Sequence, residues 1–195
     1  MIMRTTNTIL VMFITGCILV GYSFAEVNVV DGFWEKKNIK MIASSLMWTI
    51  NTAEKQAIAL LASDEKLKTH PVACGHAMRF LGRIRSIKGV DILAKRLLFE
   101  TTLSYDAIVG PALMYPAYQP LVEIGHPSVK GLLSHIAGNQ TTKKYRGVAM
   151  PAIVAIVGKD GFVETVTTFG AKQKIDADAQ KRLKQLTSEF QKLYQ

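Results

Sequence analysis

The chain has 195 residues, of which 49% are hydrophobic and 20% charged, with a formal net charge of +9 and two cysteines. This length suits one domain behind a targeting segment, and the apolar fraction excludes wholesale disorder. Two cysteines cannot build a disulfide scaffold, and the single long apolar run argues against a multi-pass membrane protein. The basic charge indicates an anionic partner without specifying its class.

Residues 1–25 have the three-part pattern of a secretory signal. Arg4 supplies the positive charge, Ile9–Val20 is the apolar run, and Ser23-Phe24-Ala25 resembles a cleavage site. We therefore predict export to the periplasm or the extracellular space, with a mature chain of residues 26–195.

Two alternatives would keep the protein on a membrane. One is an uncleaved signal that acts as an anchor. The other is a lipid on Cys17, because Ile14-Thr15-Gly16-Cys17 resembles a bacterial lipobox. Cleavage after Ala25 would leave Cys74 as the remaining cysteine, and we predict that Cys74 is a buried apolar residue rather than a reactive thiol.

Apolar residues recur at helical spacing through almost the whole mature chain, whereas the alternation typical of strands is almost absent. Residues 26–68 carry one apolar stripe, which Asn51 and Glu54 are predicted to divide into two helices by capping. Pro71 marks the start of the next helix, and Ser86 is predicted to cap the helix after it.

The helical pattern continues in the second half of the chain. Three prolines predict short helical pieces between residues 104 and 124. We expect a loop at 138–142 and a linker at 170–175, and we assign helix to the β-branched run 163–169 because of its place in the repeat described next. Further helices are expected to begin at Pro127, Thr142, Asp160 and Asp176.

A helix end, a tight turn and a second helix occur three times with apolar residues at matching offsets. Aligning Ile84, Ile124 and Val157 gives spacings of 40 and 33 residues. Gly125 and Gly158 follow the second and third of these positions and can take the left-handed conformation that ends a helix. One such helix pair cannot bury its apolar faces alone, so the pairs are expected to stack.

The segment Leu121–Leu133, with the sequence LVEIGHPSVKGLL, resembles the core of a HEAT repeat, especially the short bacterial HEAT-like form. The resemblance extends over residues 69–169 and is weakest at the first turn, where Arg85 stands in the glycine position. It implies an all-α fold, a short α-solenoid of stacked antiparallel helix pairs without a β-sheet. Residues 26–68 and 175–195 would cap its ends.

The repeat spacing leaves a second fold open. A HEAT repeat has a period of about 40–47 residues, and the second interval here is shorter. An ordinary helical bundle with chance similarity among its amphipathic helices is therefore the alternative to the solenoid.

No catalytic or metal-binding motif stands out. The sequence contains no HExxH, GxSxG, P-loop, GxGxxG or CxxC pattern, and its four histidines lack metal-ligand spacing. The His-Glu dipeptides by which some HEAT-repeat enzymes bind iron do not occur either. We therefore predict no catalytic residue, metal site or cofactor.

Basic residues concentrate in two stretches, residues 71–99 with a net charge of +5 and residues 143–174 with +4. The two clusters do not coincide when the repeats are aligned, so no continuous basic ridge is predicted. Arg79 and Arg83 are predicted to share one helical face. Lys143, Lys144 and Arg146 begin another helix, where a positive charge gains nothing from the helix macrodipole. The candidate contacts for an anion or a partner are Arg79, Arg83, Lys143, Lys144 and Arg146.

Together with the predicted signal and the lack of catalytic motifs, the resemblance implies an exported, non-enzymatic repeat protein that serves as a protein-interaction or scaffold module. Its partner is expected to be a protein, and nucleic acid is not expected. One alternative is an envelope-associated binder of anionic polymers or lipid head groups that uses the basic helix faces. A further alternative is an enzyme with an unrecognised site.

Overall fold

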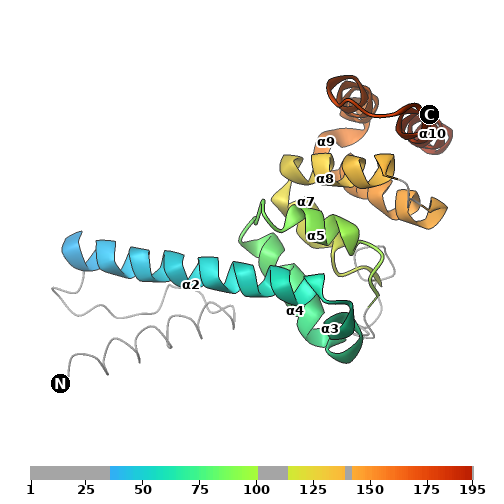
Figure 1. Cartoon of the computed structure of the whole chain (residues 1–195). Helices are drawn as coiled ribbons and strands as arrows, with labels where there is room; N and C mark the ends of the chain where they lie inside the picture. The colour runs from blue at the N-terminus through green and yellow to red at the C-terminus, as the bar shows by residue number, and fades with distance from the viewer. Residues whose placement is uncertain (1–35, 101–113, 139–141, 195) are drawn as a thin grey trace, which may run out of the picture. The chain divides into compact units, whose positions relative to one another are not determined.

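A computed structural model describes the backbone of residues 36–100, 114–138 and 142–194, with side chains from Ala43 onward (Figure 1). Within these ranges the chain is all-α, with eight helices and no strand, as the periodicity predicts. The predicted signal, including Cys17, lies outside the described residues. The chain divides into two compact units, residues 1–53 and residues 54–195.

Helix α2 (Lys36–Ala62) is continuous and belongs to the first unit as far as Ala53 and to the second from Glu54. The predicted division of this helix is therefore wrong. Glu54 is buried, and its carboxylate accepts hydrogen bonds from Ser86 Oγ at 2.7 Å and from Lys88 Nζ at 3.2 Å. Because Glu54 binds the turn after α4, it does not cap a new helix within its own segment.

Helices α3 (Asp64–Thr69) and α4 (Pro71–Arg83) follow α2. Helix α3 was not predicted from the sequence; its N-cap is Ser63, whose hydroxyl accepts a hydrogen bond from Lys66 N at 3.2 Å. Helix α4 begins at Pro71 as predicted. The fixed φ of proline suits the first helical turn, where its missing N–H is not needed.

Helix α5 (Val90–Lys95) is shorter than the sequence predicts. Ser86 Oγ accepts a hydrogen bond from Gly89 N at 2.9 Å, so this serine holds a turn ahead of the helix instead of capping the helix itself. Its second bond, to Glu54, ties that turn to α2.

Four more helices complete the described chain: α7 (Tyr118–Ile124), α8 (His126–Ala137), α9 (Lys143–Lys172) and α10 (Ala177–Tyr194). The predicted caps of the last two are confirmed. Thr142 Oγ1 accepts from Tyr145 N at 3.1 Å, and Asp176 Oδ1 accepts from Ala179 N at 2.6 Å. Such caps satisfy N–H groups that have no partner within the helix.

Helix α9 corrects one boundary and confirms another assignment. The predicted linker at 170–175 is wrong at its start, because the helix runs through Gly170 to Lys172. The run 163–169 is helical, as predicted. Gly158 has non-helical backbone angles inside α9, so the helix consists of two segments that meet at the predicted turn.

The three aligned turns share one backbone feature. Among the described residues, positive φ occurs at Arg85 (50°), Gly125 (83°) and Gly158 (77°), the residues that follow the three aligned apolar positions. At the two glycines ψ is −142° and 164°, so the backbone is extended there and does not adopt the expected left-handed helical conformation. That combination of angles is essentially restricted to glycine.

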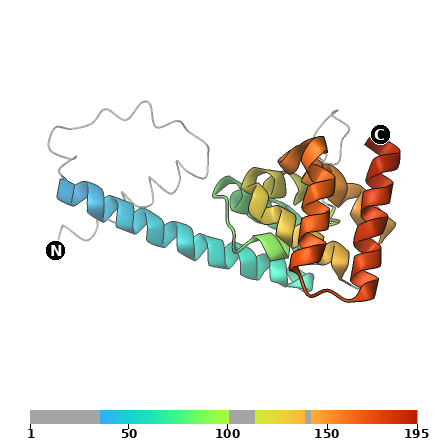
Figure 2. The same cartoon turned by 90° about the horizontal axis from the view of Figure 1, so that it is seen from above.

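The helices of the second unit pack against one another around a common core (Figure 1). Helix α7 packs against α4 and α9, while α8 packs against α5, α9 and α10. Figure 2 shows the end of α9 beside α10.

Fully burying a large apolar side chain contributes about 1.5–3 kcal/mol. The core includes Leu61, Met78, Leu81, Leu93, Leu121, Leu132, Ile136, Ile153, Phe162 and Phe190.

Two glycines allow close approach between helices that are distant in the sequence. A Cβ atom on Gly82 of α4 would lie 2.6 Å from Pro120 Cα of α7. A Cβ atom on Gly131 of α8 would clash with Val90 Cγ1 of α5. These two glycines therefore bring the backbones of α4 and α7, and of α5 and α8, close together.

Candidate functional site

Arg146, one of the predicted anion contacts, forms a structural ion pair. Its guanidinium is buried and donates two hydrogen bonds to Glu189 of α10, from Nε at 3.1 Å and from Nη2 at 2.9 Å. These bonds lower the pKa of the Glu189 carboxyl, against the opposing effect of burial. A planar guanidinium suits this two-point contact. Arg146, which the sequence suggested as a contact for an external anion, thus joins α9 to α10.

Lys144 and Lys143 begin α9, where the sequence places them. Lys144 Nζ lies 2.7 Å from Glu100 Oε1, and this contact lowers the pKa of Glu100 and raises that of Lys144. The same ammonium lies 5.6 Å from the centre of the Tyr115 ring. Lys143 is exposed. Lys144 is therefore also engaged within the fold, although its contact is at the surface, where such pairs are weak.

Arg79 and Arg83 lie one turn apart on α4, so the predicted shared face is present. Arg83 is exposed and Arg79 is partly buried. The two basic clusters lie on different helices, α4 and α9, and each of these helices packs against α7. Two of the five candidates are already paired with carboxylates, which removes much of the free positive charge that the sequence indicated.

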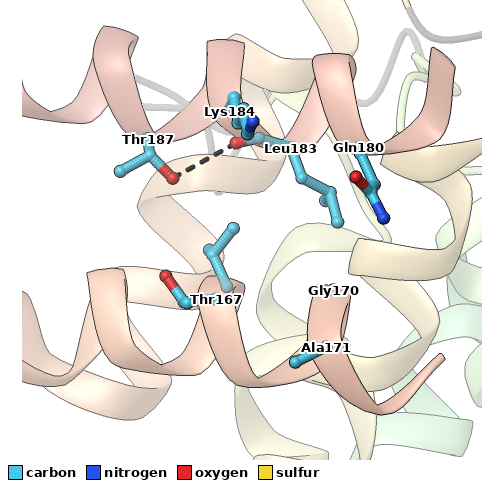
Figure 3. Close-up of a pocket in the computed structure, with 8 residues that line it drawn as sticks. Thr167, Gly170, Ala171, Gln180, Leu183, Lys184 and Thr187 are labelled. Atoms are coloured by element: carbon cyan, nitrogen blue, oxygen red, sulfur yellow. Dashed lines mark hydrogen bonds between the residues drawn. The ribbon is translucent and has the colours of Figure 1, made fainter. Parts of the chain in front are cut away.

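A groove that the sequence analysis missed lies between the end of α9 and α10 (Figure 3). Its volume is about 310 Å³. Helix α9 contributes Val166, Thr167, Gly170 and Ala171, and helix α10 contributes Gln180, Leu183, Lys184 and Thr187.

The groove is apolar because its hydroxyl groups are already bonded. Thr167 Oγ1 donates to Val163 O at 2.8 Å, and Thr187 Oγ1 donates to Leu183 O at 3.2 Å, as Figure 3 shows for the latter. Each threonine thus satisfies its hydroxyl on its own helix. Gln180 and Lys184 supply the polar groups of the lining.

Small residues create the depth of the groove. A Cβ atom on Gly170 would lie 3.4 Å from Leu183 Cδ1, and the neighbouring lining residue is Ala171. The sequence contained a signal for this surface, since positions 180, 183, 184 and 187 form one helix face. Because Gly170 was predicted to lie in a linker, the sequence did not indicate the α9 wall of the groove, which faces α10.

The part of the chain that the structure describes contains side chains of metal-ligating types and the remaining cysteine, Cys74. Over those residues, no group of three histidine, cysteine or carboxylate side chains is arranged to hold a metal ion. The predicted burial of Cys74 is confirmed, and burial raises the pKa of its thiol, which disfavours the reactive thiolate. Over the same residues, no helix is long and apolar enough to cross a membrane.

No protein-family model matches this chain, and no curated protein or solved structure matches it either. What can be inferred about function therefore rests on the sequence pattern and on the geometry of the described helices. The groove between α9 and α10 is the candidate functional site because it combines an apolar lining with an opening to solvent.

Proposed function

We propose that this protein is a HEAT-like α-solenoid that acts as a non-enzymatic protein-interaction module. We further propose that the groove between α9 and α10 binds an apolar helical segment of a protein partner. The observation that carries this proposal is the groove itself, which is apolar, open and bordered by two helices.

The order of helix packing supports the solenoid. Helix α7 has α4 and α9 as neighbours, and α8 has α5, α9 and α10, so each of the two central helices packs against an earlier and a later helix. Positive φ at Arg85, Gly125 and Gly158 marks the three turns that the repeat alignment placed at equivalent positions. Stacked helix pairs of this kind present extended surfaces to partners.

The shape and lining of the groove favour a helix as the bound element. Two neighbouring helices with small residues between them form a trough, and an amphipathic helix buries its apolar face in such a trough through positions spaced by three and four residues. Lys184 is exposed beside the apolar lining. An acidic residue next to the apolar face of the partner would pair with it.

The same lining disfavours a catalytic role. Lys184 is the one titratable side chain among the eight lining residues, and both threonine hydroxyls donate within their own helices. General acid–base and nucleophilic catalysis require a positioned pair of such groups. A surface with one lysine and apolar walls is suited to recognition.

The first prediction concerns filling the groove. Ala171→Trp places an indole in the space that the partner helix would occupy, so we expect affinity to fall at least tenfold, as hot-spot losses commonly do. Ala155→Trp is the matched control, because Ala155 is also exposed on α9 and does not line the groove. Partners are captured from an envelope extract and identified, and the affinity of each purified partner is then measured by titration.

A charge variant separates this site from the basic clusters. Lys184→Glu should weaken binding, whereas Lys181→Glu makes the same charge change at a residue that does not line the groove. Equal binding by Ala171→Trp and Ala155→Trp would contradict the proposal. Loss of binding only when Arg79 and Arg83 are changed to glutamate would place the interaction on α4 instead.

A further inference from the structure

The part of α2 that belongs to the first unit exposes apolar side chains. Trp48 is 71% exposed and Met47 is 56% exposed. Between Ala43 and Ala53 no side chain is buried. Helical spacing places Ala43, Ser44, Met47, Trp48 and Asn51, the exposed residues of this segment, along one side of the helix.

Lysine occupies the helix positions that continue this side toward the N-terminal end of α2. By the same spacing, positions 36, 37 and 40 lie along this side, and all three are lysine. No acidic residue occurs from Lys36 to Ala53. The segment thus combines three positive charges with an exposed indole and thioether, and it has no negative charge of its own.

We propose that residues 36–53 of α2 form an interfacial helix that binds the surface of an anionic lipid bilayer. Lysines are attracted to acidic head groups, and each contributes through the negative surface potential. Tryptophan favours the boundary between head groups and acyl chains, where its ring is partly apolar and its N–H stays hydrogen-bonded. A helix of this composition lies in the plane of the interface.

Charge complementarity selects lipid over a second copy of the chain as the occupant. Pairing this side of α2 with its own copy would offer the three lysines no acidic partner within the segment. An anionic bilayer supplies phosphate groups for all three lysines and an apolar layer for Trp48 and Met47. This proposal is independent of the groove between α9 and α10, so either can fail alone.

The test uses the full chain with Trp34→Phe, which leaves Trp48 as the sole tryptophan. Vesicles of phosphatidylcholine with and without phosphatidylglycerol are added, and the emission of Trp48 is recorded. We expect a shift to shorter wavelength and quenching by brominated acyl chains with the anionic vesicles only. The shift should diminish as salt rises from low to high concentration, because salt screens the lysines.

Charge variants identify the segment responsible. Changing Lys36, Lys37 and Lys40 to glutamine should weaken binding on the order of 100-fold, at about fivefold per lysine. Changing Lys130, Lys172 and Lys181 to glutamine alters the net charge equally on exposed residues of the second unit and should have little effect. Circular dichroism verifies that both variants remain helical.

Three results would overturn the proposal. Trp48 emission that stays at its aqueous wavelength with anionic vesicles would show that the helix does not bind them, even if the predicted signal segment attaches the chain. An equal shift with uncharged vesicles would remove the role of the lysines. A shift that appears without lipid as the protein concentration rises would identify a second copy as the occupant.

Discussion

Arg85 has the positive φ that glycine provides at the two later turns, and its surroundings explain how it is held there. Its N–H donates to Gly82 O at 2.9 Å, and Ser86 N–H donates to Leu81 O at 2.9 Å. These two bonds form the Schellman motif that ends α4. The sequence predicted a turn here, and arginine in the glycine position was a departure from the pattern. These two hydrogen bonds hold the arginine backbone at positive φ, and a local sequence pattern does not reveal them.

The second prediction follows from this backbone strain. A non-glycine residue in the left-handed region costs about 1–2 kcal/mol, and glycine loses roughly 0.5–1 kcal/mol more entropy on folding than alanine. We therefore expect Arg85→Gly to stabilise the protein by about 0.5–1 kcal/mol, measured by urea unfolding. A lower unfolding free energy for this variant would show that the arginine side chain contributes more than its backbone costs.

The third prediction concerns the glycine turns. A Cβ atom on Gly125 or Gly158 would meet nothing within 4 Å, so substitution there introduces backbone strain without a steric clash. Gly125→Ala and Gly158→Ala are each expected to cost about 1–3 kcal/mol in the same assay. Gly147→Ala is the control, since Gly147 also has open space around its Cβ position but lies within the helix. Equal effects at all three positions would rule out positive φ as the cause.

At the scale of the elements, α10 is joined to the rest by polar and apolar contacts together. Arg146 of α9 pairs with Glu189, and Arg182 Nε donates to Ala137 O of α8 at 2.9 Å. The rings of Phe162 and Phe190 stack with their centres 4.3 Å apart. Periodicity and the Asp176 cap predicted the existence of α10. Its partners could not be predicted, because Arg146 and Glu189 are 43 residues apart and have no shared motif.

The fourth prediction is a double-mutant cycle on this ion pair. Arg146→Met should destabilise the protein by about 2–3 kcal/mol, because it leaves the partly buried Glu189 carboxylate without its guanidinium. Adding Glu189→Leu should restore part of that loss, since replacing both charges with apolar groups leaves no unpaired ion. Strictly additive losses for the two substitutions, measured by chemical denaturation, would mean that the two side chains do not interact energetically.

At the scale of the whole molecule, three buried or partly buried titratable groups shift the pH dependence of stability in the same direction. The Ser86 hydrogen bond lowers the pKa of Glu54, and the Arg146 hydrogen bond lowers that of Glu189. Burial lowers the pKa of His135 from 6.5, despite its hydrogen bond to the backbone of Asp91. In each case the unfolded chain binds protons more readily than the folded chain, so stability falls as the pH falls.

The fifth prediction is therefore a two-phase loss of stability in acid. The melting temperature should decline first as pH drops below about 6.5, when unfolded His135 takes up a proton, and again below about 4.5, when the glutamates do. His135→Gln should remove the first phase, and Glu189→Gln should reduce the second. A melting temperature that rises between pH 7 and pH 5 would contradict the assigned directions. Constant ionic strength keeps surface screening equal across the series.

The sequence by itself determined the all-α class, several helix starts and the three aligned turns. These features depend on local physics: apolar spacing, capping side chains, proline at helix starts and glycine at positive φ. Tertiary structure decided which polar side chains are free and which surfaces stay open. It showed Glu54 and Arg146 engaged with residues 32 and 43 positions away, and an apolar groove beside Gly170. Such pairings and openings depend on how distant helices pack, which no local pattern encodes.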